Sequence, residues 1–236
     1  MARFHLPAAA WLAEPALCGD EARHLSQVLR IKAGAAITIF DGDGRRATAE
    51  VLAVSRDRVP LRIGEILPSP QPLPAITLAQ AIPKGKNMDL IVQKSVELGI
   101  TAIQPLVTRH TVVQPGDGKS EKWRRNALEA CKQCGQDRLP IIAEPLAFER
   151  WIDHPHVGLK LIASLAPGAL PLRETLRQHS GSTAVTLLIG PEGDFSQEET
   201  AAALAAGFLP VTLGPIVLRV ETATLFCLSA LRYEFS

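Results

Sequence analysis

A proline-rich segment, Pro68 to Pro74, holds four prolines in seven residues and restricts what the chain can form there. Each proline fixes its backbone φ angle and removes an N–H donor, so the segment can neither continue a helix nor occupy the centre of a sheet. Such a composition is typical of a semi-rigid, extended spacer. It predicts a first domain at residues 1–67, a linker at 68–74 and a second domain at 75–236.

Residues 1–67 carry the signals of a small β-barrel. The motif Asp41 to Gly44 lies between two apolar runs, 36–40 and 47–54, and an Asp-Gly pair in that setting predicts a hairpin. A further run, 59–66, alternates as a half-buried strand does. Short strands at this spacing are typical of a barrel, and residues 21–30 predict a helix beside it. The predicted apolar face of that helix consists of Ala22, Leu25, Val28 and Leu29.

Beyond the linker, predicted strands and helices alternate to the end of the sequence. This alternation is typical of a mostly parallel sheet with helices on both faces, so the predicted fold class is α/β. The predicted strands are 75–82, 102–107, 159–165, 184–189 and 211–213, and the predicted helices are 88–98, 120–136, 170–179, one that begins at Ser196, and 222–233.

Two of these strands end in glycine-rich loops, Gly190 to Gly193 and Gly214 to Leu218. Glycine has no Cβ, so the backbone amides of such loops can approach a ligand closely. The carboxyl ends of parallel strands meet at one edge of a sheet, which is where ligands bind in α/β folds. After the first loop, Ser196 and Glu199 form the pattern of a capping box, which predicts a helix start. The two loops together predict a ligand site.

Composition and charge exclude several classes of protein. A formal net charge of +1 gives no overall attraction to nucleic acid, so any RNA site must be a local patch. Four cysteines do not make the disulfide framework of a small secreted protein, and the first residues lack the apolar core of a signal peptide. No apolar run approaches the ~20 residues that cross a bilayer. We therefore expect a cytoplasmic protein with no membrane partner.

The motifs of several common enzymes are absent from the sequence. It lacks the G-x-G-x-x-G and P-loop patterns of nucleotide-binding folds, the H-E-x-x-H of zinc peptidases and the G-x-S-x-G of α/β-hydrolases. Cys131 and Cys134 lie inside a predicted helix, and no second pair stands at a spacing suited to zinc. They are interpreted as ordinary helix residues, and no metal is expected.

Basic residues gather at two places in the sequence. A solvated surface explains any one of them, but two basic groups in different domains fit a clamp on a phosphate backbone. The predicted RNA-binding residues are Arg3, Arg23 and Arg30 in the first domain, and Lys84, Lys86, Arg109 and Arg138 in loops and at strand ends of the second.

A family resemblance rests on the two glycine-rich loops. Leu187 to Gly193 reads Leu-Leu-Ile-Gly-Pro-Glu-Gly, and Leu213 to Ala223 reads Leu-Gly-x-x-x-Leu-Arg-x-Glu-Thr-Ala. These motifs resemble the SPOUT-class RNA methyltransferases, and most closely the RsmE family, which methylates N3 of a uridine in small-subunit (16S) ribosomal RNA. The likeness covers nearly the whole chain and includes Pro83-Lys84-Gly85, Gln93-Lys94-x-x-Glu97-Leu98-Gly99 and Glu129-Ala130-x-x-Gln133-Cys134-Gly135.

The resemblance implies an N-terminal PUA-like β-barrel and a C-terminal SPOUT α/β domain with a deep trefoil knot. It implies S-adenosyl-L-methionine as the methyl donor, 16S rRNA or the small ribosomal subunit as substrate, and a homodimer that pairs through knot-region helices. Carried onto this sequence, the cofactor-binding residues are Leu165, Ile189, Gly190, Glu192, Gly193, Leu213, Gly214, Ile216, Leu218 and Thr222.

Two positions depart from the family pattern: Ile216 and Gln136 stand where members usually carry Arg. Arg219 is then the predicted catalytic cation, which stabilises negative charge on the uracil oxygens. Glu221, the second predicted catalytic residue, or Glu192 is expected to orient the base or relay its proton. A carboxylate in the first turn of a helix also interacts favourably with the helix dipole, so Glu221 fits a structural role equally well.

The sequence is also compatible with two other functions. Another SPOUT activity, such as ribose 2′-O methylation, shares the knot but not this combination of barrel and motifs. A non-catalytic RNA-binding factor for ribosome assembly is the second, and absence of S-adenosylmethionine binding would favour it.

Overall fold

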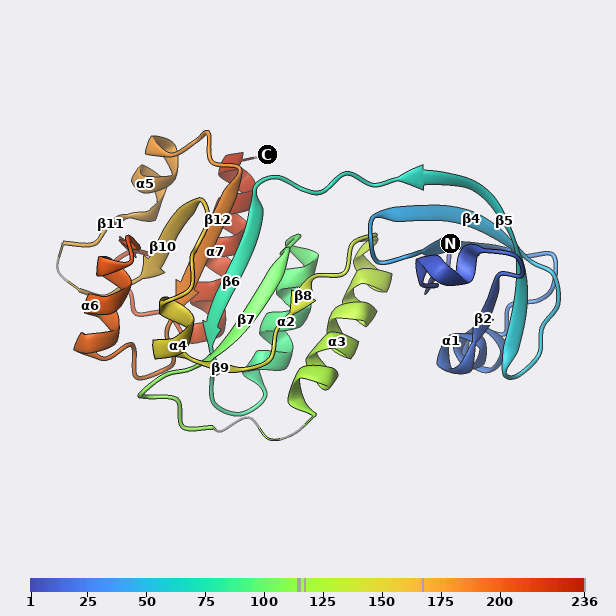
Figure 1. Ribbon diagram of the computed structural model, residues 1–236, viewed down its shortest axis with the longest axis horizontal. Helices are drawn as coiled ribbons and strands as arrows, with labels where there is room; N and C mark the ends of the chain where they lie inside the picture. Colours follow the sequence, from blue (N-terminus) through green and yellow to red (C-terminus); the bar gives the residue numbers. More distant parts are fainter. Residues whose placement is uncertain (114–115, 117, 167, 236) are drawn as a thin grey trace. The chain divides into compact units, whose positions relative to one another are not determined.

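The computed structural model describes residues 1–113, 116, 118–166 and 168–235. The chain divides into two compact units (Figure 1). Unit 1 comprises Met1–Gln71 together with Cys131–Leu139, and unit 2 comprises Pro72–Ala130 together with Pro140–Ser236. The sequence pattern does not indicate that residues 131–139 join unit 1, because they lie far along the chain from the rest of it.

Unit 1 is built on a five-stranded sheet in the order β1-β3-β4-β5-β2. Strand β1 pairs with β3 in parallel and the other neighbours are antiparallel, with a register shift between Ala47 and Ala49 where β4 meets β5. The predicted hairpin at Asp41 to Gly44 is confirmed, since it joins β3 to β4. The strands are β1 (Arg3–His5), β2 (Ala16–Cys18), β3 (Ala36–Phe40), β4 (Arg45–Val51) and β5 (Arg58–Pro68), with a short 3-10 helix, η1 (Ala8–Trp11).

The helix predicted at residues 21–30 is correct only in its first half. It forms as α1 (Gly19–Arg23) and then widens into a π-helical turn, η2 (His24–Val28). Ala22 and Leu25 are fully buried, whereas Val28 is 70% exposed and Leu29 is 44% exposed. A π turn takes more residues per turn than an α turn, so it rotates the last two off the face that α-helical spacing predicts.

Unit 2 contains an eight-stranded sheet in which every pair is parallel. The strand order is β11-β13-β10-β12-β6-β7-β8, and β9 pairs with β7. The prediction of a mostly parallel sheet is therefore confirmed. Its strands are β6 (Ala75–Ala81), β7 (Ala102–Val107), β8 (Ile141–Ile142), β9 (Leu146–Ala147), β10 (Leu159–Ala163), β11 (Leu170–Pro171), β12 (Ala184–Ile189) and β13 (Leu209–Thr212).

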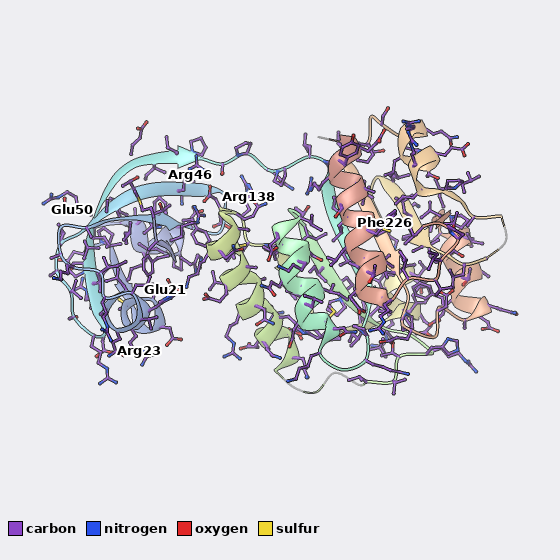
Figure 2. All side chains as sticks on the ribbon, turned by 180° about the vertical axis from the view of Figure 1, so that it is seen from behind. Glu21, Arg23, Arg46, Glu50, Arg138 and Phe226 are labelled. Carbon is purple, nitrogen blue, oxygen red and sulfur yellow. The ribbon has the colours of Figure 1, made fainter. Side chains whose placement is uncertain are left out.

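Helices cover both faces of this sheet. One face carries α4 and α6, which pack against each other over a buried cluster that includes Phe148, Phe195 and Phe208. The other face carries α2 and α7, which lie in front of the sheet in Figure 2. Among the described residues, every helix falls short of the length and hydrophobicity that a bilayer crossing requires. The helices are α2 (Asn87–Glu97), α3 (Lys119–Cys134), α4 (Phe148–Ile152), α5 (Leu172–Gln178), α6 (Gln197–Ala205) and α7 (Val220–Phe235).

Candidate active site

A cavity of about 470 Å³ lies in unit 2 at the carboxyl ends of four neighbouring strands, β13, β10, β12 and β6. The segments that follow β10, β12 and β13 supply most of its lining, and Asn87 at the start of α2 supplies the contribution from beyond β6. Because the strands are parallel, these chain-distant segments emerge at the same edge of the sheet. The cavity therefore stands where the two glycine-rich loops predict a ligand site.

The loop after β12 is a tight turn that glycine and hydrogen bonds hold in place. The Asp194 N–H donates to the Pro191 carbonyl at 3.0 Å, and Asp194 itself has a left-handed φ of 57°. A Cβ on Gly190 would lie 3.2 Å from the Asp194 carboxylate and from the Phe195 ring. That is tighter than ordinary van der Waals contact, so a residue with a side chain at this position would push the turn out of shape.

The predicted capping box after this loop is confirmed. The Glu199 N–H donates to the Ser196 hydroxyl at 3.2 Å, and the Ser196 N–H donates to the Glu199 carboxylate at 2.8 Å. The other oxygen of Glu199 accepts the Arg109 N–H at 2.9 Å. Glu199 therefore fixes both the start of α6 and the loop that follows β7, although its own exposed fraction is only 5%.

The loop after β13 forms the opposite wall and leads directly into α7. Gly214 has a φ of 118°, a conformation that L side chains rarely adopt, and the apolar side chains of Ile216 and Val217 are 73% and 71% exposed. The first turn of α7 is tied to the sheet by a fully buried polar pair. The Thr224 hydroxyl hydrogen-bonds the Gln80 side-chain oxygen at 2.7 Å, and Gln80 lies on β6.

The charges that line the cavity are mainly negative. Three carboxylates, Glu192, Asp194 and Glu221, face one guanidinium, Arg219. The Lys84 N–H donates to Glu192 Oε1 at 2.9 Å, and the Asn87 Nδ2 donates to Glu221 Oε2 at 3.1 Å. These donors are neutral, so the carboxylates keep their net charge. A cavity with this balance favours a ligand that carries positive charge.

Ten of the twelve predicted cofactor and catalytic residues line this cavity. Gly193 lies instead in a second hollow beyond the loop, and Thr222 is an exposed residue in the first turn of α7. The roles of all twelve stay predictions. The residues that the structure brings together are Leu165, Ile189, Gly190, Glu192, Leu213, Gly214, Ile216, Leu218, Arg219 and Glu221.

The lining also includes residues that sequence reasoning missed. Asn87 and Ser164 follow β6 and β10 at the same edge of the sheet as the glycine-rich loops. Their position at or just after the ends of predicted strands is the one feature of the sequence that could have indicated them as lining residues. Nothing in the local sequence says which strand ends become neighbours. The missed residues are Asn87, Ala163, Ser164, Pro191, Asp194, Val217, Val220 and Ala223.

The predicted RNA-binding residues of unit 1 occupy different environments. Arg3 is largely buried: its guanidinium donates to the Asp137 carboxylate at 2.7 Å and lies over the Phe40 ring at 4.9 Å. Arg23 pairs with Asp20 on the surface of α1, and Arg30 is exposed with a left-handed φ of 52°.

Arg138 belongs to unit 1 and packs against the hairpin. Its Nε donates to the Ser69 carbonyl at 3.2 Å, and a Cβ on Gly44 would lie 2.4 Å from its guanidinium. Glycine at position 44 therefore makes room for this cation. Figure 2 labels Arg138 and, on β4 of the same unit, Arg46.

The predicted RNA-binding residues of unit 2 lie close to the strand ends. Lys84 and Arg109 line the second hollow, and Lys86 is exposed immediately before α2. Within the described residues, no group of three or more His, Cys, Asp or Glu is arranged to hold a metal ion. Cys131 is buried in α3, and burial raises the pKa of its thiol to about 12.

Comparison with known families assigns both parts of the chain. Residues 69–232 match the model of an RNA methyltransferase domain, and residues 17–64 match that of an RNA methyltransferase PUA domain. The predicted PUA-like N-terminal domain beside an α/β methyltransferase domain is thereby confirmed.

Curated relatives carry the name ribosomal RNA small subunit methyltransferase E. The Synechocystis protein is 34% identical over 203 residues, which are 85% of this chain and 66% of that protein. The Bacillus subtilis protein is 27% identical and covers 92% of this chain and 89% of its own. This chain thus spans about two thirds of the first relative and most of the second.

Solved structures extend the likeness to the whole fold. A ribosomal RNA small subunit methyltransferase E from Neisseria gonorrhoeae, solved with S-adenosylmethionine, superposes with a TM-score of 0.88 at 35% identity and covers 99% of this chain and 97% of its own. A Legionella pneumophila protein, also solved with this cofactor, gives 0.88 at 34% identity, with coverage of 98% and 97%. Since the methyltransferase model alone spans more than half of the sequence and these structures match nearly all of it, the chain belongs to the ribosomal RNA small subunit methyltransferase E family.

Proposed function

We propose that this protein transfers a methyl group from S-adenosylmethionine to N3 of a specific uridine in 16S rRNA. The observation that carries the proposal is the cavity at the ends of β6, β10, β12 and β13, built from the same loops that carry the family motifs. The gonococcal relative of the same fold was solved with this cofactor, which supports the choice of methyl donor.

The residues of the cavity fit the cofactor chemically. S-adenosylmethionine carries a sulfonium cation, and three carboxylates against one guanidinium give the cavity the complementary charge. Adenine requires apolar walls and hydrogen-bonding backbone groups, and seven Leu, Ile and Val residues line the cavity together with Gly190 and Gly214. A volume of about 470 Å³ lies within the range of small-molecule sites. The seven aliphatic residues are Leu165, Ile189, Leu213, Ile216, Val217, Leu218 and Val220.

Arg219 and Glu221 are the residues that we assign to the chemistry. When bound, S-adenosylmethionine supplies an electrophilic methyl group, so that the N3–carbon bond forms as the sulfur–carbon bond breaks and a neutral thioether leaves. The N3 proton must depart in the same process. Glu221 accepts or relays it, and Arg219 stabilises the negative charge that spreads to the uracil oxygens. Glu192, on the opposite wall, is the alternative proton relay.

The cavity also limits the form of the RNA that it accepts. Base pairing hides N3 of uridine, so the target base must be unpaired or flipped out of its helix before the reaction. Holding donor and acceptor together then supplies much of the rate, because the two react at high effective molarity.

We further propose the finer features that the family resemblance implies. The second domain would close in a deep trefoil knot that contains the cofactor loops, and two subunits would pair through knot-region helices. The domain division at residues 67 and 75 is supported by the two family matches, which end at 64 and begin at 69. The PUA-like domain would bind rRNA, and the protein would act in the cytoplasm, where ribosomal subunits are assembled.

Mass spectrometry of small-subunit rRNA tests the proposal directly. A deletion strain should lack one N3-methyluridine, and the unaltered gene should restore it. Persistence of every such nucleotide in the deletion strain would exclude the activity. Calorimetry with S-adenosylmethionine forms the second arm: the protein should bind it, and Arg219→Ala should retain binding while turnover falls by roughly 10²–10³. Full turnover of that variant would refute the role of Arg219.

A further inference from the structure

A second hollow of about 440 Å³ lies in unit 2, on the far side of the loop that walls the active site. It is lined by basic and small residues and contains no acidic side chain: Lys84, Arg109, His110, Thr111, Val112 and Gly193. We call this the basic hollow. Its cations come from the segments that follow β6 and β7, so the sheet itself brings them together.

The cations of the basic hollow are available to a ligand. Lys84 and Arg109 are exposed, and neither forms a salt bridge within the described part of the chain. The positive charge of Arg109 is one of the causes that lower the pKa of the Glu198 carboxyl. The pKa of Glu198 is lowered first by its own backbone N–H, then by the Ser196 hydroxyl, and only after these by Arg109.

The loop Gly190 to Asp194 lines both the active-site cavity and the basic hollow. Two residues of the basic hollow, Lys84 and His110, hold this loop by hydrogen bonds. The Lys84 N–H donates to the Glu192 carboxylate at 2.9 Å. His110 Nδ1 bonds the Asp194 carbonyl at 2.9 Å. A carbonyl oxygen only accepts, so Nδ1 carries the proton. The ring is held in one orientation while its other nitrogen keeps its hydrogen-bonding capacity.

Gly193 lies against His110 with no room for a side chain between them. A Cβ at position 193 would lie 3.1 Å from the Cβ of His110, so any larger residue would displace the histidine and narrow the hollow. The loop thus lines both hollows, with Gly193 on the basic hollow and its neighbours Glu192 and Asp194 on the active-site cavity.

We propose that the basic hollow binds a backbone phosphate of the RNA strand beside the nucleotide that enters the active site. The inference rests on the proposed function and deepens it by fixing where the strand runs. An arginine offers planar, paired donors to phosphate oxygens and a lysine adds a point charge, which together are the usual phosphate-binding set. The loop Gly190 to Asp194 contributes residues to both hollows, so a phosphate bound there would belong to a nucleotide close in sequence to the reacting one.

Binding measurements on variants of the intact protein test this placement. The probe is unmethylated 16S rRNA transcript, titrated at several salt concentrations, and S-adenosylmethionine affinity is measured in parallel. The double variant Lys84→Ala/Arg109→Ala should weaken RNA binding about tenfold or more. The slope of log affinity against log salt should fall by about 0.7 for the lost phosphate contact. The double variant Arg173→Ala/Arg177→Ala on α5 removes the same two charges from a different surface of unit 2 and is the matched control.

Several outcomes would overturn the proposal. RNA affinity and salt slope equal to those of Arg173→Ala/Arg177→Ala would show that the hollow holds no phosphate. A fall in S-adenosylmethionine affinity with RNA binding intact would assign the hollow to the cofactor's carboxylate instead. RNA binding is measured without methyl transfer. The comparison of RNA affinities therefore tests the basic hollow even if the proposed methylation is wrong. Arg109→Lys, which keeps the charge, should retain more RNA affinity than Arg109→Ala; equal losses would point to a packing defect.

Discussion

Asn87 and Glu221 meet at the active site although they come from the beginnings of two different helices. The Asn87 amide donates to the Glu221 carboxylate at 3.1 Å and leaves its charge uncompensated. A neutral donor therefore orients the carboxylate without placing a second charge beside it, which suits a proton relay.

Replacing this donor by a carboxylate gives the first prediction. Asn87→Asp would place two like charges about 3 Å apart, and one of them would then bind a proton more readily. Methyl transfer should fall by about tenfold or more at neutral pH, and the acid limb of the pH–rate profile should move to higher pH. Asn87→Gln, which keeps the amide, is the control. An unshifted profile in Asn87→Asp would remove Glu221 from the proton pathway.

His156 provides a prediction about pH and stability. Its ring lies 4.2 Å from Trp151 and 5.5 Å from Phe208, centroid to centroid, and its Nε2 is buried without a partner in the described structure. Burial is the main cause that lowers its pKa below the ordinary 6.5. As the pH falls, His156 therefore binds a proton more readily in the unfolded chain than in the folded chain. The stabilisation is complete above pH 6.5 and is lost as the pH falls through the folded-state pKa.

His156→Phe should remove this contribution. The free energy of unfolding, measured in urea between pH 8 and pH 5, should fall less steeply in the variant than in the unaltered protein. His154→Phe changes an exposed neighbour whose charge lowers the pKa of His156 less than burial does, so this variant should keep most of the original slope. If both variants followed the unaltered protein, His156 would titrate alike in the folded and unfolded states.

At the scale of elements, a buried hydrogen bond attaches α7, which lines the candidate active site, to β6. Thr224 on α7 and Gln80 on β6 are both fully buried, and a 2.7 Å hydrogen bond joins their side chains. This bond attaches α7, whose first turn contains Glu221, to the centre of the sheet. The Thr224 hydroxyl also lies 3.0 Å from the Val220 carbonyl, which closes the first turn.

Thr224→Val tests this attachment with almost no change of volume. The variant leaves the Gln80 oxygen buried and unpaired, which should cost about 1–3 kcal/mol of unfolding free energy. Cofactor affinity should fall with it, because α7 carries one wall of the cavity. Thr222→Val, two residues earlier on the exposed surface, should be nearly neutral. Equal effects of the two changes in chemical denaturation would show that the buried pair adds nothing.

Local elements were largely predictable from the sequence. Strands β7 and β12 occupy the predicted residues 102–107 and 184–189, because a short apolar run carries its own signal. The two-residue strands β8 and β9 were missed, since no periodicity exists over two residues. Residues 170–179 form a strand and then a helix rather than one helix, because pairing of Leu170 and Pro171 with β13 overrides their local preference.

At the scale of the whole molecule, long-range pairing placed residues that no local signal could. Asn87, Ser164 and Asp194 share a cavity only because the sheet order sets β10, β12 and β6 side by side. Residues 131–139 likewise join unit 1 through Asp137, which is 2% exposed. Its carboxylate accepts the Ser69 hydroxyl at 2.7 Å as well as the Arg3 guanidinium.

Asp137→Asn should therefore loosen unit 1 specifically. Removing the charge leaves the largely buried Arg3 cation without its main partner, and breaking a buried ion pair costs about 3–5 kcal/mol. Thermal unfolding followed by hydrogen exchange should show faster exchange in β1 and β3, while β12 of unit 2 keeps its protection. Asp153→Asn, an exposed aspartate of unit 2, is the control. Uniform loss of protection across both units would show that Asp137 does not act locally.

The parallel order of the strands has a consequence for folding. The cavity exists only when segments that follow β6, β10, β12 and β13 have all arrived at one edge, and these contacts span most of unit 2. Contacts so distant along the chain form late and slowly. A ligand of this cavity recognises the finished fold alone, and mass action then makes it a stabiliser of that fold. A plentiful supply of such a ligand would thereby raise the free energy of unfolding of each finished molecule.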